Sequence, residues 1–348
     1  MKNILYVLMC LLFINGYACT SFGVVTKSGT IIGKNRDYYY DKQVFDLVYP
    51  NKQFTEWFGN SFKHNNKFYA VLSNNDVKMG VNQYGLTAIE EDPLYPGLNR
   101  RYIQPMNGYS EGMVLYGILQ NFATVDEIIP YIKNIFSSAA PNFYQIADKK
   151  KILVVEVGFA ESDLNTTRPY VYDIINSEDG IFVHTNTYTS TKFLPLNKLK
   201  GNSDIEKGSN YRLNNMTQLL KHTKYNEVSL FDLFMNTKSS LSKVGDKNWC
   251  QNTSIFRSYI HETNHIKVGD FENDKLFGTV SNLLITNFKD NTRVNLRVLD
   301  SLDTLENGDQ KIVYEELNVA LNTLFTKKSM KFTRKFFVRK APQNNICI

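Results

Sequence analysis

The sequence predicts an α+β protein in which two mainly antiparallel β-sheets stack face to face, with helices on the outside. Short runs of β-branched and aromatic residues, separated by polar turns, predict strands over much of the chain. Two stretches with helical spacing interrupt these runs, which gives the order strands, helices, strands, helices, strands. Because the sequence shows no internal repeat, low-complexity segment or long linker, we expect residues 19–348 to form one domain.

Residues 1–18 have the pattern of a removable export signal. Lys2 gives a positive start, Ile4–Ile14 is almost entirely apolar, and Gly16 and Ala18 are small residues three and one positions before Cys19. The apolar run is shorter than the roughly 20 residues of a membrane-spanning helix. We therefore expect cleavage after Ala18 and export to the periplasm or the extracellular space. Exported lipoproteins also begin at a modified cysteine, but the residues before Cys19 fit the lipoprotein pattern poorly.

The first half of the mature chain contains the first strands and helices. Residues 21–38 predict two strands joined by a turn at residues 27–29, and residues 68–73 and 85–91 predict two more. Apolar residues then recur at helical spacing between Tyr109 and Ile135, where Thr124 and Glu127 form a capping box. We expect two successive helices in that region.

The second half repeats this order. Strand patterns return in four short segments, at residues 142–148, 151–157, 170–175 and 181–186. Helices are predicted at Tyr211–His222 and Leu230–Leu241. The last predicted strands lie at residues 254–261, 275–286, 292–299 and 332–338. The final one alternates cations with apolar residues, which is typical of an edge strand protected from pairing with other sheets.

Composition and charge exclude several classes of function. The hydrophobic content of 43% and the charged content of 21% are those of an ordinary globular protein. The net charge of +6 is modest for 348 residues and no nucleic-acid-binding motif accompanies it, so we expect no nucleic-acid partner. Among the five histidines, His261 and His265 are four residues apart but lie in a strand-and-turn context. We therefore expect no metal or other cofactor, and the oligomeric state stays open.

Cys19 is chemically unusual among the cysteines. Of the four cysteines in the chain, Cys10 lies in the signal, which leaves Cys19, Cys250 and Cys347. An odd number in an oxidising compartment leaves at least one thiol free or paired between chains, and whether Cys250 and Cys347 are bridged stays open. A cysteine at the first position can use its own α-amino group as a base, because the pKa of that amine is roughly 7.7–8.0. Catalysis at Cys19 then needs no histidine.

The segment CTSFGVVTKSGTIIGKNRDY, residues 19–38, resembles the start of the cysteine N-terminal nucleophile (Ntn) hydrolases. The group includes choloylglycine hydrolase, penicillin V acylase, acid amidase and acyl-CoA:6-aminopenicillanic acid acyltransferase-like proteins. Its members open with Cys-Thr and reach Gly-Arg-Asn-x-Asp after a strand pair; here the corresponding stretch is residues 33–37. Later segments such as GVNQYGLTAIEED, HTNTYTSTKF and GSNYRLNNMTQLL keep the family's order, so the resemblance covers most of residues 19–300. It implies a four-layer αββα sandwich.

The resemblance also implies a set of catalytic residues. Cys19 corresponds to the nucleophile, and Asp37 to the carboxylate that holds the N-terminal ammonium or the thiol in place. Asn186 resembles the asparagine whose side-chain amide donates to the tetrahedral oxyanion. Arg212 resembles an arginine near the nucleophile that lowers the pKa of the thiol and orients the site.

Three further positions, Lys34, Arg36 and Asp92, are predicted to bind substrate, and here the chain departs from the family pattern. The arginine that usually follows the first glycine is Lys34, with an arginine displaced to Arg36; lysine keeps the charge but lacks the planar guanidinium fork. In the bile-salt and penicillin branch a second oxyanion asparagine follows the strand that here ends near Asp92. An ionised carboxylate would repel an oxyanion, so either a backbone N–H replaces that donor or Asp92 faces elsewhere.

The function implied by the resemblance is that of an exported amidohydrolase. It would cleave linear, non-peptide amide bonds of small N-acyl compounds through a thioester on Cys19. Candidate substrates are N-acyl amino acids, bile-salt-like conjugates, phenoxyacyl amides and fatty-acid amides. An acyltransferase or a dipeptidase of the same superfamily is an alternative. The non-enzymatic alternative is a surface binding protein with a lipid on Cys19, and the chemical state of the mature N-terminus separates it from an enzyme.

Overall fold

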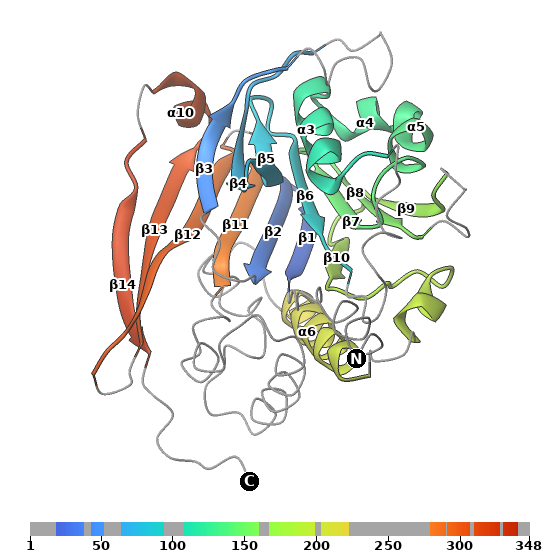
Figure 1. Ribbon diagram of the computed structural model, residues 1–348. Helices are drawn as coiled ribbons and strands as arrows, with labels where there is room; N and C mark the ends of the chain where they lie inside the picture. The colour runs from blue at the N-terminus through green and yellow to red at the C-terminus, as the bar shows by residue number, and fades with distance from the viewer. Residues whose placement is uncertain are drawn as a thin grey trace, which may run out of the picture.

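Two seven-stranded antiparallel sheets lie face to face, with helices against their outer faces (Figure 1). The structure is a computed structural model that describes residues 19–37, 43–51, 64–93, 108–159, 167–198, 203–222, 279–289, 291–306, 310–327 and 330–339. Several sequence predictions fall outside these residues: the signal peptide at residues 1–18, the helix at 230–241, the strand at 254–261, and Cys250, His261, His265 and Cys347.

The first sheet contains both ends of the described chain. Its strands, in spatial order, are β10 (Ile181–His184), β1 (Thr20–Thr26), β2 (Gly29–Asp37), β11 (Thr279–Phe288), β12 (Arg293–Thr304), β13 (Gln310–Ala320) and β14 (Thr333–Arg339). The strand that begins after Cys19 therefore lies between β10 and β2. The cation-rich strand β14 lies at the sheet edge, which confirms the expectation from its sequence pattern.

The second sheet is a meander in which each strand pairs with its neighbour in sequence. Its strands are β3 (Gln43–Val48), β4 (Phe68–Ser73), β5 (Asp76–Asn82), β6 (Thr87–Glu91), β7 (Phe143–Ala147), β8 (Ile152–Val157) and β9 (Tyr170–Ile175). Strand β5 was not predicted from the sequence. Asn74 and Asn75, with φ of 51° and 64°, form the tight connection between β4 and β5, because asparagine tolerates the left-handed region that such hairpins require.

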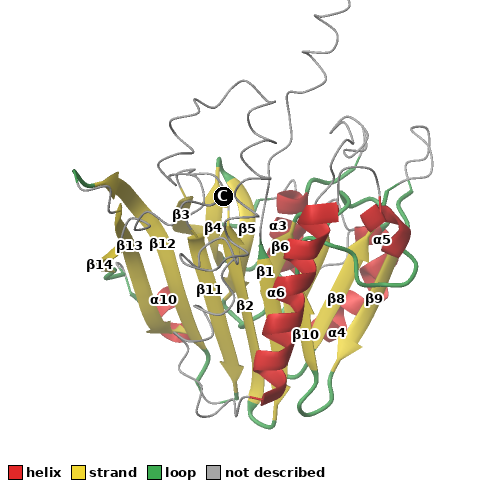
Figure 2. Cartoon of the chain, turned by 90° about the horizontal axis from the view of Figure 1, so that it is seen from below, coloured by secondary structure: helices red, strands yellow, loops and turns green. Residues whose placement is uncertain are grey.

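Helices cover both sheets. Helices α3 (Glu111–Asn121), α4 (Val125–Ile128) and α5 (Ile132–Phe136) lie on the second sheet, and α6 (Ser203–His222) lies on the first. Figure 2 shows α6 running along β1 and β10. Shorter elements are α10 (Leu321–Thr326) and two 3-10 turns, η2 (Ile129–Tyr131) and η3 (Leu194–Lys198).

The predicted helix after Thr124 is confirmed at its start but is broken into short pieces. Thr124 Oγ1 accepts from the backbone N–H of Glu127 at 3.4 Å, as the capping pattern predicts. Pro130 then falls in the turn η2 between α4 and α5. Proline has no N–H to donate and its ring crowds the preceding turn, so the helix does not continue unbroken.

Three other elements differ from the sequence predictions. Strands β3 and β13 were not predicted, because their alternation of apolar and charged residues is irregular. Helix α6 begins at Ser203, eight residues before the predicted start at Tyr211. These eight residues carry little apolar periodicity, so the sequence pattern alone placed the start too late.

Apolar side chains fill the spaces between the four layers. Phe22 and Ile31 pack towards α6, whereas Val25 and Ile32, from the same two strands, pack against the second sheet. Residues between the second sheet and its helices include Phe68, Ala70, Val114, Ile118 and Phe136. This order of helix, sheet, sheet and helix confirms the predicted αββα sandwich.

Polar residues replace apolar ones at one end of the space between the sheets. Lys34, Glu91 and Glu156 are all buried, and each lies two residues along its strand from an apolar residue of the inter-sheet core. Since side chains two apart in a strand share a face, these charged groups point into the sandwich. The N-terminal end of β1 lies at the same end of the sandwich, because Ser21 contacts Glu91.

Candidate active site

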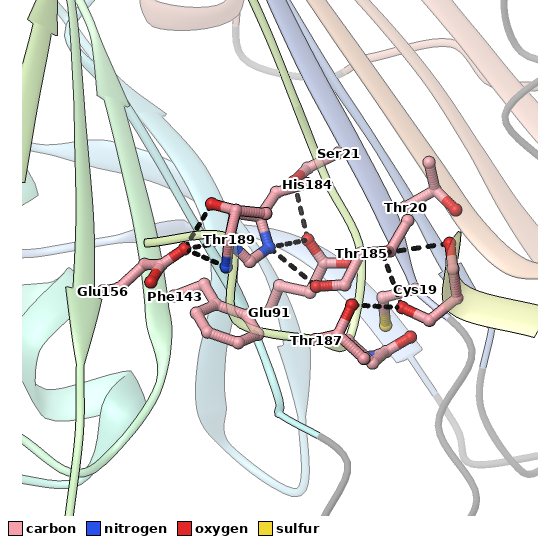
Figure 3. A network of polar contacts seen from close by, with 12 residues as sticks. Cys19, Thr20, Ser21, Glu91, Phe143, Glu156, His184, Thr185, Thr187 and Thr189 are labelled. Carbon is pink, nitrogen blue, oxygen red and sulfur yellow. Dashed lines mark hydrogen bonds and ion pairs between the residues drawn. The ribbon is translucent and has the colours of Figure 1, made fainter. Parts of the chain in front are cut away.

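Cys19 lies immediately before β1 and is buried, with 4% of its surface exposed. It is a free thiol. Thr20 pairs with Asn35 of β2, and Ser21 pairs with His184 of β10. Figure 3 shows Cys19 at the edge of a network of polar contacts that extends from β1 to Glu156. The cysteine is thus held at the buried end of a central strand of the first sheet.

Arg212 of α6 joins Cys19 to Asn186. Its Nη2 atom donates to the carbonyl oxygen of Cys19 at 3.4 Å and to Oδ1 of Asn186 at 2.8 Å, and its Nε donates to Oγ1 of Thr20 at 3.2 Å. Three residues predicted from separate parts of the sequence are therefore brought together.

The side-chain amide of Asn186 has a defined orientation. Its Oδ1 accepts from Arg212, and its Nδ2 donates to the backbone oxygen of Asp92 at 2.8 Å. An amide nitrogen carries two N–H groups, so one remains for a further acceptor within the described part of the chain. This remaining N–H is suited to an oxyanion, which is the role predicted for Asn186.

Hydroxyl groups anchor the loop that follows β10. Ser209 of α6 lies one helical turn before Arg212, and its Oγ contacts Oγ1 of Thr185 at 2.6 Å and Oγ1 of Thr187 at 2.9 Å. These two threonines flank Asn186. The same face of α6 therefore holds both the asparagine and its two neighbours.

The two predicted cations of β2 are buried. Lys34 and Arg36 are 1% and 3% exposed. The ammonium group of Lys34 donates to the backbone oxygen of Glu90 and lies 3.4 Å from Oε1 of the same residue. Lys34 therefore binds the second sheet through Glu90, and a contact with substrate stays a prediction for both cations.

The surroundings of Cys19 favour a neutral thiol in the uncleaved chain. Burial raises the pKa of the Cys19 thiol to about 12; Glu91 and Glu90 add to this effect, whereas Lys34 and Arg36 oppose it. In the uncleaved chain the nitrogen of Cys19 is an amide and cannot take up the proton. A thiolate therefore requires a base that takes up this proton.

The carboxylate of Asp92 is bound by Asn142 and not by Asn186. Its Oδ1 accepts from Nδ2 of Asn142 at 3.1 Å, and the same Asn142 nitrogen donates to Oε2 of Glu90 at 3.2 Å. Only the backbone oxygen of Asp92 contacts Asn186. Of the alternatives left open by the sequence, the geometry favours the one in which the Asp92 carboxylate faces elsewhere.

The ionisation of Asp92 has a measurable consequence for stability. Burial and the charges of Glu90 and Glu111 raise the pKa of Asp92 to about 7. Between about pH 4 and pH 7 the folded state keeps a proton that the unfolded chain has released, so Asp92 makes folding less favourable as the pH rises.

We expect Asp92→Asn to stabilise the protein increasingly over this pH range. The gain in the free energy of unfolding at pH 8 relative to pH 4 should be on the order of 2 kcal/mol after discounting for partial exposure. Urea unfolding at the two pH values measures it. Asp173→Asn, at an exposed position of β9, is the control and should show no such dependence. A gain that is equal at both pH values would contradict the assignment.

Asp37 ends β2, and its backbone pairs with Thr279 of β11. The strand end lies beside the start of β1, since the register pairs Asn35 with Thr20. This backbone position agrees with the position expected for Asp37. The contacts of its carboxylate lie outside what the structure describes, so its role stays a prediction.

Three charged residues at the centre of the site were not predicted from the sequence. His184, Glu91 and Glu156 are buried, and His184 lies close to both carboxylates. The sequence signal for each of them was a carboxylate or imidazole at the end of an otherwise apolar strand. Such a residue is buried with its strand, and a buried charge needs a partner. In the described ranges no group of His, Cys, Asp and Glu is arranged to hold a metal ion, and no helix has the length and apolarity to cross a membrane.

Comparison with known proteins agrees with the predicted superfamily. Residues 24–263 match the family described as acyl-coenzyme A:6-aminopenicillanic acid acyl-transferase, and the match begins within β1 after Cys19. No curated protein was matched.

Two of the solved structures that match this chain do so at low identity and over most of its length. A mutant of the conjugated bile acid hydrolase from Clostridium perfringens is 15% identical, with a TM-score of 0.42 over 91% of this chain and 96% of that chain. The Caenorhabditis elegans ortholog of N-acylethanolamine-hydrolyzing acid amidase is 14% identical, with a TM-score of 0.44 over 78% of this chain and 94% of that chain.

Proposed function

Because the chain belongs to the acyl-coenzyme A:6-aminopenicillanic acid acyl-transferase family of cysteine Ntn enzymes, we propose that it is an exported amidohydrolase. Its substrates are small N-acyl compounds with a linear, non-peptide amide bond. Removal of residues 1–18 during export exposes Cys19 as the nucleophile, and the reaction uses no cofactor.

One observation carries this proposal: a single guanidinium group binds both the residue of the nucleophile and the candidate oxyanion donor. Arg212 donates to the carbonyl of Cys19 and to Oδ1 of Asn186. A side-chain donor fixed in advance near a nucleophile is the arrangement that acyl transfer requires, since it stabilises charge that develops only in the transition state.

The reaction proceeds in two steps in this proposal. The α-amine of Cys19 takes the thiol proton, the sulfur attacks the amide carbonyl, and the free N–H of Asn186 donates to the resulting oxyanion. The new ammonium then protonates the leaving nitrogen as the carbon–nitrogen bond breaks, which leaves a thioester. Water attacks the thioester, its proton passes to the α-amine, and the acid is released as the thiol is restored.

A second function, acyl transfer, is favoured by the description of the matched family. The same thioester would then be attacked by an amine instead of water. Both functions share the first step and differ only in the second acceptor. The partition of a common intermediate therefore separates them.

The test uses the processed protein and a panel of N-acyl amides with varied acyl groups and leaving amines. We expect release of free acid, together with an acyl adduct on Cys19 that intact-mass analysis detects in rapidly quenched samples. Adding a primary amine at increasing concentration shows whether a new amide replaces the acid. If neither product nor adduct forms with any substrate, and the mass shows a lipid on Cys19, the protein is a binding protein instead.

A further inference from the structure

Both ring nitrogens of His184 contact oxygen atoms that accept hydrogen bonds. Nδ1 lies 2.6 Å from the backbone oxygen of Thr185, and Nε2 lies 3.0 Å from Oε1 of Glu156. A carbonyl oxygen can only accept, so Nδ1 carries a proton. His184 is 2% exposed, which leaves little access for water.

Glu156 is an acceptor in all of its contacts. Its Oε1 accepts from the backbone N–H of Thr189 at 2.7 Å, and its Oε2 accepts from the backbone N–H of Ser190 at 3.1 Å. Burial alone would raise the pKa of Glu156, but the hydrogen bonds and the charge of His184 outweigh it and lower the pKa to about 2. Glu156 is therefore ionised, Nε2 of His184 is its donor, and His184 is an imidazolium.

A second carboxylate lies on the other side of the imidazole. Oε2 of Glu91 is 3.9 Å from Nδ1 of His184 and accepts from Oγ of Ser21 at 2.7 Å. Ser21 lies two residues after Cys19 and is the cross-strand partner of His184. Figure 3 shows the resulting line of contacts from Ser21 through Glu91 and His184 to Glu156.

These contacts connect strands β1, β6 and β8 to the imidazolium of His184. Ser21 belongs to the strand of the nucleophile, and Glu91 and Glu156 belong to the second sheet. Thr189 and Ser190 close the far side of the loop that begins after His184 and carries Asn186. The ring of Phe143 lies over His184, with 4.0 Å between the ring centroids, and shields the cation from solvent.

We propose that His184, held as an imidazolium between Glu91 and Glu156, is a positioning residue that fixes the Asn186 loop against the strand of Cys19. This inference rests on the proposed function only where it is tested by enzyme kinetics. His184 touches neither the nucleophile nor the oxyanion donor, so it acts through the loop and the strand.

The charge of His184 depends on the groups around it. Burial lowers the pKa of His184, but Glu156 and Glu91 outweigh this and the net direction is upward. Burial raises the pKa of Glu91, and the charges of His184, Lys34 and Arg212 oppose this rise without cancelling it. A histidine with a raised pKa contributes its stabilisation at low pH and loses it as the pH rises past that pKa.

The first experiment compares His184→Gln with His64→Gln. His64 lies 3.2 Å from Oε1 of Glu127, away from the site, and is a matched histidine–glutamate pair. We expect His184→Gln to lower kcat by about 10- to 100-fold with KM changed less than about threefold, because small displacements of a positioned donor cost rate rather than binding. His64→Gln should leave both constants unchanged. An unchanged kcat in folded His184→Gln overturns the proposal.

The second experiment keeps the imidazole and removes its counter-ion. Glu156→Gln should lower the pKa of His184 and move the alkaline limb of kcat/KM to lower pH, whereas Glu127→Gln should not. A purely structural role would lower the rate without moving this limb. A limb that stays in place in Glu156→Gln overturns the proposal, and this variant also serves if His184→Gln does not fold.

A third readout does not depend on turnover. Nitrogen NMR of histidine-labelled protein should show both nitrogens of His184 protonated at pH 7, and the side-chain amide signal of Asn186 should shift in His184→Gln but not in His64→Gln. A neutral His184 or an unmoved Asn186 signal overturns the proposal. If the wild type cleaves no amide but these signals behave as expected, the proposed function fails and the positioning role stands.

Discussion

Replacement of Cys19 by alanine is expected to abolish amide turnover by the processed protein. Cys19 carries the thiol, and Arg212 joins the backbone carbonyl of Cys19 to the side-chain amide of Asn186. Loss of a nucleophile that acts as a unit with its base typically costs on the order of 10⁴-fold or more in kcat. Initial rates with the best substrate of the panel measure the loss. Cys19→Ser should keep weak activity, since a hydroxyl can use the same α-amine less effectively.

The uncleaved precursor should be as inactive as Cys19→Ala. Replacing Ala18 with a bulky residue blocks the small-residue cleavage site and keeps the nitrogen of Cys19 as an amide. Burial then holds the pKa of the thiol at about 12, so very little thiolate forms at neutral pH. Rates of Cys19 alkylation in precursor and processed protein provide a second measurement. Full activity of the purified precursor would contradict the role of the α-amine.

Removal of the Asn186 amide should give the second-largest loss. Asn186→Ala deletes the N–H available to the oxyanion, and removal of one such donor typically costs about 10²- to 10³-fold in kcat. Asn214, exposed on α6, is a control position where alanine should leave kcat unchanged. A loss expressed mainly in KM would argue that Asn186 binds the ground state instead.

Arg212 should not add its full effect to that of Asn186. Arg212→Met alone releases Oδ1 of Asn186 and the carbonyl of Cys19, so we expect a loss of similar size. Because the two side chains are hydrogen-bonded, the double variant should lose less than the product of the two single losses. Multiplicative losses would indicate that the two residues act separately.

The sequence predicted the two stacked sheets and their outer helices, because these depend on local signals. Runs of apolar and β-branched residues on both sides of a polar turn indicate β1 and β2, and Thr124 and Glu127 define the start of a helix. The positions of Asn186 and Arg212 came from a resemblance, and the hydrogen bonds between them came only from the structure. Strands β3 and β13 were not recognised because their apolar and polar residues alternate too irregularly.

The charged residues between the sheets could not be predicted for a different reason. His184, Glu91 and Glu156 come from three strands in two sheets, and nothing in the spacing of one strand indicates what faces it across a sandwich. A buried charge requires a partner, but the partner is selected by tertiary packing. The sequence also led to the prediction that catalysis needs no histidine. That conclusion concerned the proton acceptor alone and did not consider a histidine that acts through Asn186.

Helix α6 presents Ser209 and Arg212 one turn apart, and the two side chains reach different strand ends of the same sheet. Three residues of an α-helix span about 4.5 Å along the helix axis, and this length changes very little. The helix therefore fixes the spacing between the backbone at Cys19 and the segment that carries Asn186, independently of other loops. Insertions in other loops can then change which substrates enter the site while these two segments keep their separation.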